Sequence, residues 1–166
     1  MDKKIRGLII SFKYAFRGLA YCVGGERNLR IHMVVAGYVA YFSSFYELAK
    51  GQVAILMVSI SLVIICEMLN TAIEALVDRV APTYDSMARI AKDVAAGAVL
   101  VSALFSILVG WILLWDVPTI GLIAISIVVS PVSLFTHATA LAASVYFIFY
   151  GYRDIVAPIK RWLKRT

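Results

Sequence analysis

Three long stretches without a charged residue most constrain how this 166-residue chain can fold. They cover residues 51–66, 94–115 and 117–152. About 20 apolar residues cross a hydrocarbon core of ~30 Å as a helix, so each stretch can form at least part of a span. The apolar residues are consecutive rather than alternating, which favours helices over the strands of a barrel. The sequence therefore predicts an all-α integral membrane protein.

The composition and the distribution of basic residues agree with this fold class. Hydrophobic residues make up 62% of the chain, charged residues 16%, and the mean hydropathy is +0.88. If the N-terminus is cytoplasmic and four spans follow, Lys50 is the only one of the sixteen Lys and Arg residues on the far side. This positive-inside pattern explains the net charge of +6 without a nucleic-acid partner. We expect a multi-pass protein of the cell membrane with its N-terminus, and any site at that membrane face, on the cytoplasmic side.

Residues 67–78, with the sequence EMLNTAIEALVD, continue one apolar run with a stripe of polar side chains. The stripe consists of Glu67, Asn70, Glu74 and Asp78. On a helix these four positions fall within an arc of about 80°. An ionisable group at the edge of the membrane costs on the order of 3 kcal/mol, so the stripe predicts a metal, proton or substrate site. The alternative is a helix end that simply reaches the cytosol.

Two further groups of charged residues should meet the stripe at the same membrane face. Glu26 precedes the first apolar run, where a role limited to capping the helix is the alternative. Arg89, Lys92 and Asp93 share one face at the start of the third span. Carboxylates beside cations suit Mg²⁺ carrying nucleotide phosphates, and the deeper Glu67 could act on a lipid hydroxyl. Spacing alone fits a membrane transporter or channel that uses intramembrane carboxylates equally well.

The chain divides into four regions. We expect an interfacial amphipathic helix over residues 1–25, a core of three spans over 26–115, an additional membrane segment over 116–152 and a basic amphipathic tail over 153–166.

The additional segment is too long for one simple span. We favour a short interfacial or re-entrant piece near residues 118–130, followed by a span near residues 132–150. Two full crossings would instead place the basic tail outside the cell. His137 is interpreted as a polar packing residue.

Four runs of this sequence resemble the prokaryotic diacylglycerol kinase family, which includes the undecaprenol kinases. They are SFKYAFRGL, GERNLRIH, EMLNTAIEALVD and ARIAKDVAAGAVL, within residues 11–115. The resemblance implies an ATP- and Mg²⁺-dependent lipid kinase with three spans and an interfacial helix per subunit. It also implies a homotrimer whose active sites are shared between neighbouring subunits. The forms GERNLRIH and NTAIE favour undecaprenol as the membrane lipid alcohol, with diacylglycerol next.

The same resemblance implies roles for individual residues. Glu67 matches the catalytic carboxylate, and Glu26 and Glu74 match the metal ligands. The positions that match nucleotide contacts are Tyr14, Lys92 and Asp93. The supporting polar positions are Asn70 and Asp78, to which we add Arg89.

Two features depart from the family's pattern. Ala96 replaces a serine found in some members, and residues 116–166 are an extension. Part of the extension, PVSLFTHATALAAS, is similar to the histidine motif of membrane lipid phosphatases. The companion motifs of that family are absent, so we expect the extension to serve packing or assembly.

Overall fold

The protein is described here by a computed structural model that covers residues 3–151, and this part of the chain consists of six helices. The helices are α1 (Lys3–Gly25), α2 (Arg27–Ser43), α3 (Lys50–Val80), α4 (Ser86–Leu114), α5 (Val117–Val129) and α6 (Pro131–Tyr150). The predicted all-α fold class is confirmed for the described residues. The predicted basic tail, residues 153–166, lies outside them.

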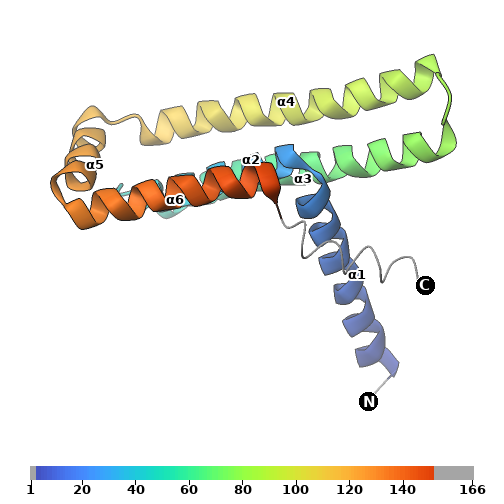
Figure 1. The fold of residues 1–166 in the computed structure, drawn as a ribbon, viewed down its shortest axis with the longest axis horizontal. Coiled ribbons are helices and arrows are strands. Elements are labelled where there is room, and N and C mark those ends of the chain that lie inside the picture. Colours follow the sequence, from blue (N-terminus) through green and yellow to red (C-terminus); the bar gives the residue numbers. More distant parts are fainter. Residues whose placement is uncertain (1–2, 152–166) are drawn as a thin grey trace.

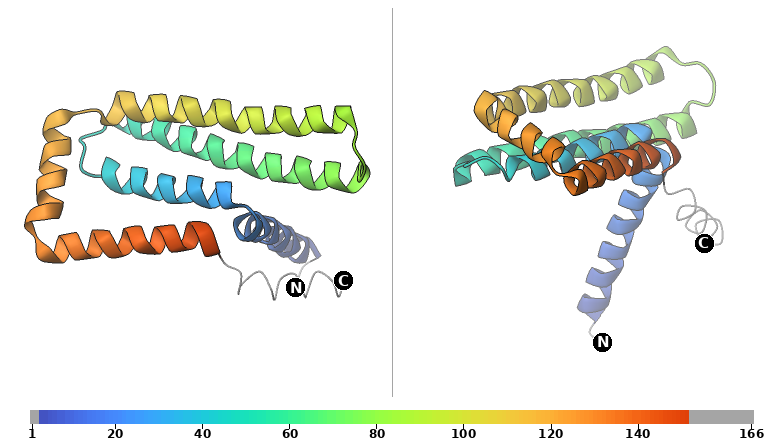
Figure 2. Two further views of the ribbon diagram at one scale, coloured as in Figure 1. Left: turned by 45° about the horizontal axis from the view of Figure 1, so that its top comes forward. Right: turned by 60° about the vertical axis from the view of Figure 1, so that its left-hand side comes forward.

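Four of the helices run side by side in the order α4, α3, α2 and α6 (Figures 1 and 2). Helix α5 crosses one end of this layer and connects α4 to α6. Helix α1 projects steeply from the N-terminal end of α2, away from α5 (Figure 2). The described part of the extension, residues 116–151, therefore packs as part of this layer. Its helix α6 returns along α2, and α2 belongs to the predicted core of residues 26–115.

Three of the described helices are long and apolar enough to cross a membrane, namely α3, α4 and α6. Helix α2, which we expected to be the first span, is not among them. It has 17 residues, or about 25 Å at 1.5 Å per residue, and its first turns carry Arg27 and Arg30. Helix α2 is thus shorter, and its N-terminal part more polar, than we expected of a first span.

Polar residues define where several helices begin. Asp85, Asp116 and Ser130 each accept a hydrogen bond from the backbone N–H three residues later, which caps α4, α5 and α6. The expected break near residue 130 is therefore present, and a short helix of 13 residues precedes the last candidate span. Because α5 lies across the end of the layer, its placement suits an interfacial or re-entrant piece (Figure 1).

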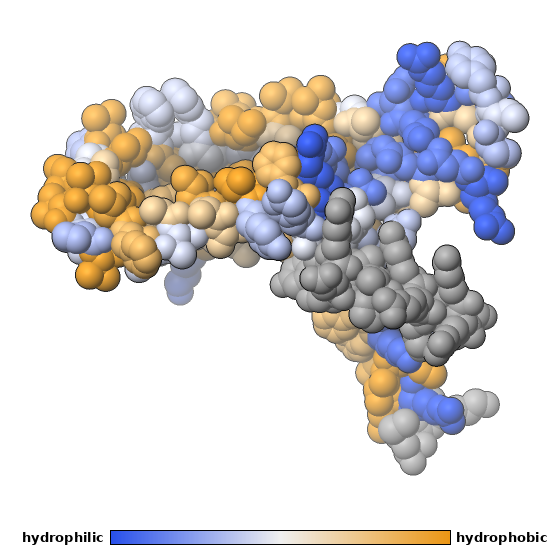
Figure 3. Space-filling model, viewed as in Figure 1, coloured by the Kyte–Doolittle hydropathy of each residue, from blue (hydrophilic) through white to orange (hydrophobic). Residues whose placement is uncertain are grey.

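Hydrophilic side chains gather at the end of the molecule where α3 passes to α4, and hydrophobic ones cover the end near α5 (Figure 3). This is the expected polarity for a site at one membrane face. The polar end holds the C-terminal half of the stripe and the charged start of α4.

Candidate functional site

Glu67 is the most buried ionisable side chain of the stripe. Its residue is 2% exposed on α3, in a molecule whose spans otherwise present mostly apolar surface. The hydroxyl of Thr71 donates to the Glu67 carbonyl oxygen at 3.0 Å, inside the same turn. The carboxylate is close enough to Glu26 and Glu74 to interact electrostatically with both. The structure thus places Glu26 and Glu74 near Glu67, three of the five acidic residues singled out in the sequence.

Glu26 occupies the turn between α1 and α2. Its backbone is extended, with φ −101° and ψ 116°, and its carboxylate makes no capping hydrogen bond to α2. A hydrogen-bonded cap therefore does not explain this residue. Helix α1 continues through Gly24 and Gly25, and the chain turns at Glu26. This turn places the Glu26 carboxylate near Glu67 and also near Cys22.

Asn70 orients the next acidic residue of the stripe. Its side-chain nitrogen donates to Oε1 of Glu74 at 3.1 Å. Its oxygen Oδ1 is buried and has no hydrogen-bond partner among the described residues. A buried amide oxygen without a partner is costly, and such an acceptor suits a cation or a hydroxyl donor.

The oxygen groups around Glu67 fit Mg²⁺ in kind. Mg²⁺ takes oxygen ligands, often one or two carboxylates together with substrate phosphates and waters. Within residues 3–151, no group of three or more His, Cys, Asp or Glu side chains could enclose a metal ion. Phosphate and water oxygens would complete the coordination of an ion held by these carboxylates.

A second set of charges lies at the passage from α3 to α4. Lys92 Nζ donates to Asp78 Oδ1 at 2.9 Å, and Glu74 also interacts electrostatically with Lys92. Glu74 thus lies between this pair and Glu67. Arg89 and Asp93 approach each other at 3.9 Å, and their side chains are 71% and 73% exposed. The structure brings Lys92 to the stripe, as expected, while Asp93 pairs with Arg89 at the exposed start of α4.

Tyr14 borders a groove of about 490 Å³ between α1 and α3. The groove is also lined by Arg17, Cys22 and Thr71, and the Arg17 guanidinium lies 5.7 Å from the centre of the Tyr14 ring. Because Thr71 follows Glu67 by one turn, the groove leads toward the same part of α3. Burial raises the pKa of the Cys22 thiol, and the nearby Glu26 carboxylate adds to the rise.

Sequence reasoning missed Thr71 and Cys22 as neighbours of the acidic group. Thr71 lies inside the quoted motif, one helical turn after Glu67, so its position was visible in the sequence. The approach of Cys22 to this group depends on how α1 packs against α3, which local spacing does not determine.

Comparison with known proteins matches residues 13–114 to the prokaryotic diacylglycerol kinase family. A diacylglycerol kinase of Synechocystis is 44% identical over 108 residues, which are 64% of this chain and 62% of that protein. An undecaprenol kinase of Bacillus subtilis is 37% identical over 100 residues, 60% of this chain and 81% of that protein. A diacylglycerol kinase of Escherichia coli K12 is 31% identical over 103 residues, 62% and 84% of the two chains.

The matched residues contain every candidate site residue and end where α4 ends. Helices α5 and α6 lie beyond the match. The chain is a member of the prokaryotic diacylglycerol kinase family.

Proposed function

We propose that this protein transfers the γ-phosphoryl group of ATP to the hydroxyl group of a membrane lipid alcohol. The observation that carries the proposal is the burial of Glu67 beside Glu26 and Glu74, within the candidate span α3 and near the α1–α3 groove. A lipid hydroxyl arriving from the bilayer and a nucleotide arriving from the cytoplasm would meet at this depth.

Glu67 acts on the acceptor in this proposal. The lipid O–H gives its proton to the Glu67 carboxylate while its oxygen bonds to the γ-phosphorus, and the bond from that phosphorus to the bridging oxygen breaks to release ADP. Phosphoryl transfer depends mainly on positioning and charge neutralisation, so a small set of groups suffices. Thr71 fixes the turn of α3 that carries the carboxylate.

Glu26 and Glu74 would hold Mg²⁺, which when bound neutralises phosphate charge. Asn70 holds the Glu74 carboxylate by its amide nitrogen, so the ligand has one preferred orientation. Glu26 is free of a capping bond and can turn toward the same ion.

The remaining site residues serve the nucleotide. Lys92 offers a cation to the phosphates, with Asp78 holding its ammonium group in place. Tyr14 and Asp93 would contact the nucleotide, and Arg89 supports Asp93. We propose that this charged end of the molecule, like the N-terminus, faces the cytoplasm, where ATP is found.

The lipid alcohol is proposed from two lines of support that differ. The forms GERNLRIH and NTAIE favour undecaprenol. The 44% identity to a protein named diacylglycerol kinase, against 37% to one named undecaprenol kinase, favours diacylglycerol instead. Undecaprenol stays our first proposal, and the two substrates are compared directly below.

We also propose a homotrimer with sites shared between subunits. Its support within one chain is that Asp93 pairs with Arg89 at the exposed start of α4, whereas Glu67 is buried on α3.

The test is a phosphorylation assay in lipid vesicles with ATP and Mg²⁺, offering diacylglycerol and undecaprenol separately. Wild type should label at least one lipid, and Glu67→Gln should lower kcat by about 10³-fold, as expected when a proton acceptor is removed. Glu47→Gln is the matched control, because Glu47 is exposed in the turn between α2 and α3. Equal activity of wild type and Glu67→Gln would overturn the catalytic role, and ion flux without ATP consumption would overturn the kinase.

A further inference from the structure

Arg30 joins three helices through its guanidinium group. The residue lies in the second turn of α2 and is only 6% exposed. Its Nε donates to the carbonyl oxygen of Ile148 at 3.0 Å, and one terminal nitrogen donates to those of Val23 at 3.0 Å and Gly24 at 3.4 Å. The first acceptor belongs to α6 and the other two belong to α1.

All three acceptors lie in the last turns of their helices. Carbonyl groups there have no partner further along the helix and carry the negative end of the helix dipole. An arginine is well suited to them because its planar guanidinium offers several donors at fixed angles and stays charged. One buried side chain on α2 therefore ties together the C-terminal ends of α1 and α6.

Gly151 makes room for this contact. It follows α6 with φ 55° and ψ −164°, a conformation that is essentially restricted to glycine. A Cβ atom at this position would lie 2.8 Å from the terminal nitrogen of Arg30. The end of α6 is thus shaped around Arg30, although Gly151 lies far outside the family match.

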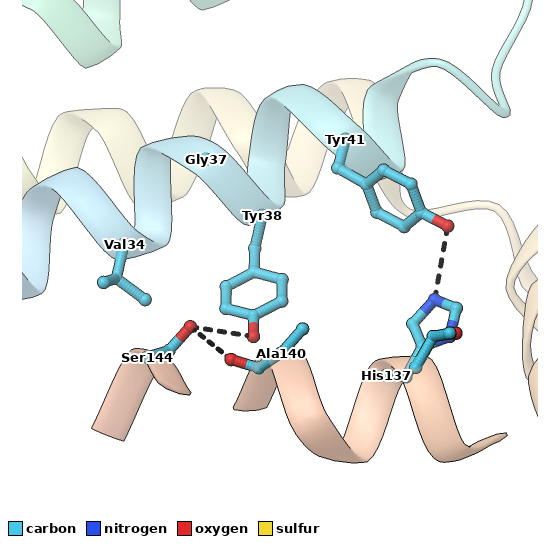
Figure 4. A pocket seen from close by; sticks show the side chains of 8 residues that line it. Val34, Gly37, Tyr38, Tyr41, His137, Ala140 and Ser144 are labelled. Carbon is cyan, nitrogen blue, oxygen red and sulfur yellow. Dashed lines mark hydrogen bonds between the residues drawn. The ribbon is translucent and has the colours of Figure 1, made fainter. Parts of the chain in front are cut away.

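Two polar contacts hold α6 in register along α2 (Figure 4). The Tyr38 and Ser144 hydroxyls are 3.1 Å apart, and the Tyr41 hydroxyl lies 3.2 Å from His137 Nε2. His137 Nδ1 is 2.8 Å from the Ser133 carbonyl oxygen, so Nδ1 carries the proton and Nε2 accepts from Tyr41. His137 therefore packs α6 against α2, in agreement with the role expected from the sequence.

We propose that Arg30 is a positioning residue through which the extension α5–α6 sets the place of α1 and Glu26 in the kinase site. This inference rests on the proposed function. Glu26 is one helical turn before Arg30, whose backbone N–H bonds to the Glu26 carbonyl oxygen at 3.4 Å. Helix α1 supplies Tyr14 and one wall of the groove. Loosening α6 from Arg30 would thus loosen nucleotide binding while leaving Glu67 in place.

The kinetic test uses full-length variants in vesicles. Gly151→Ala should raise the KM for Mg·ATP about 5-fold and change kcat less than about 2-fold, because ground-state binding is lost and the catalytic carboxylate remains. Arg30→Gln should raise KM at least as much, and Arg30→Lys should lie between it and wild type. Gly121→Ala in α5 is the matched control, because a Cβ there meets open space.

A double variant asks whether the two positions act through one contact. If they do, the KM of Arg30→Gln with Gly151→Ala should equal that of Arg30→Gln alone, since coupled residues are not additive. If the increases in KM caused by the two single substitutions multiply in the double variant, the proposal is overturned.

Hydrogen exchange provides a readout that needs no activity. Backbone amides of residues 22–30 should exchange faster in Gly151→Ala and Arg30→Lys than in wild type and Gly121→Ala. Unchanged exchange would overturn the coupling even if the protein is a kinase. Faster exchange with an unchanged KM would show a purely structural contact and also overturn the proposal. A wild type that binds and consumes no ATP would instead overturn the proposed function.

Discussion

At the scale of single residues, the site is defined by negative charge gathered in one place. Glu67 interacts electrostatically with both Glu26 and Glu74, and Asn70 adds a buried oxygen without a partner among the described residues. Like charges at close range repel, and a bound divalent cation relieves the repulsion. The acidic group is therefore more easily explained as part of a cation-dependent site than as packing.

The first prediction concerns the two proposed metal ligands. Glu26→Gln and Glu74→Gln should each raise the Mg²⁺ concentration needed for half-maximal activity by about 10-fold or more, because each removes a charged oxygen ligand. Activity titrated with Mg²⁺ at fixed ATP measures this. Glu47→Gln should need the same Mg²⁺ concentration as wild type. If Glu26→Gln and Glu74→Gln also need no more Mg²⁺ than Glu47→Gln, neither residue is a metal ligand.

A second prediction tests the geometry around Glu26 without any assay of activity. Because burial and then Glu26 raise the pKa of the Cys22 thiol, Cys22 should react slowly with iodoacetamide near neutral pH. In a Cys66→Ala background, the rate should keep rising above the pH at which an ordinary thiol levels off. Glu26→Gln should shift that profile toward lower pH. If the pH dependence of the reaction is the same with and without Glu26→Gln, Glu26 does not lie near Cys22.

At the scale of helices, the extension is built from strong local start signals. Asp116 accepts a hydrogen bond from the Thr119 backbone at 3.0 Å and begins α5, and Ser130 begins α6 immediately before Pro131. Proline is favoured in the first turn of a helix, where its missing N–H has no partner to lose. The division of residues 117–150 into two helices is therefore encoded locally.

The third prediction uses the cap of α5. The hydrogen bonds from Thr119 hold the pKa of the Asp116 carboxyl below its ordinary value. A lowered folded-state pKa stabilises the fold above the unfolded pKa, and this stabilisation is lost as the pH falls through the folded value. Asp116→Ala should thus lower the melting temperature in detergent at pH 7, and the gap to wild type should close below about pH 4. A gap of constant size would show that the charge has no part in the cap.

At the scale of the whole molecule, the sequence predicted what local patterns encode. The polar stripe of residues 67–78 lies on α3 with Glu67 and Asn70 buried, because spacing along one helix is a local property. The role of Arg30 was not predicted, since its α6 acceptor is 118 residues away and a carbonyl group leaves no mark in a sequence. The length of α2 was also missed, because the apolar run alone does not show how far polar first turns enter the membrane.

The last prediction follows from the place of Asp93 in the single chain. Asp93 pairs with Arg89 at 3.9 Å and both side chains are largely exposed, whereas Glu67 is buried. If sites are shared, a neighbouring subunit supplies Asp93 to the acidic group. Glu67→Gln and Asp93→Asn proteins should then each be nearly inactive, yet regain about a quarter of wild-type activity when unfolded, mixed in equal amounts and reassembled, because random assembly of a symmetric oligomer leaves that share of interfaces intact. Variants refolded separately and then combined are the control, and a mixture no more active than its parts would confine each site to one chain.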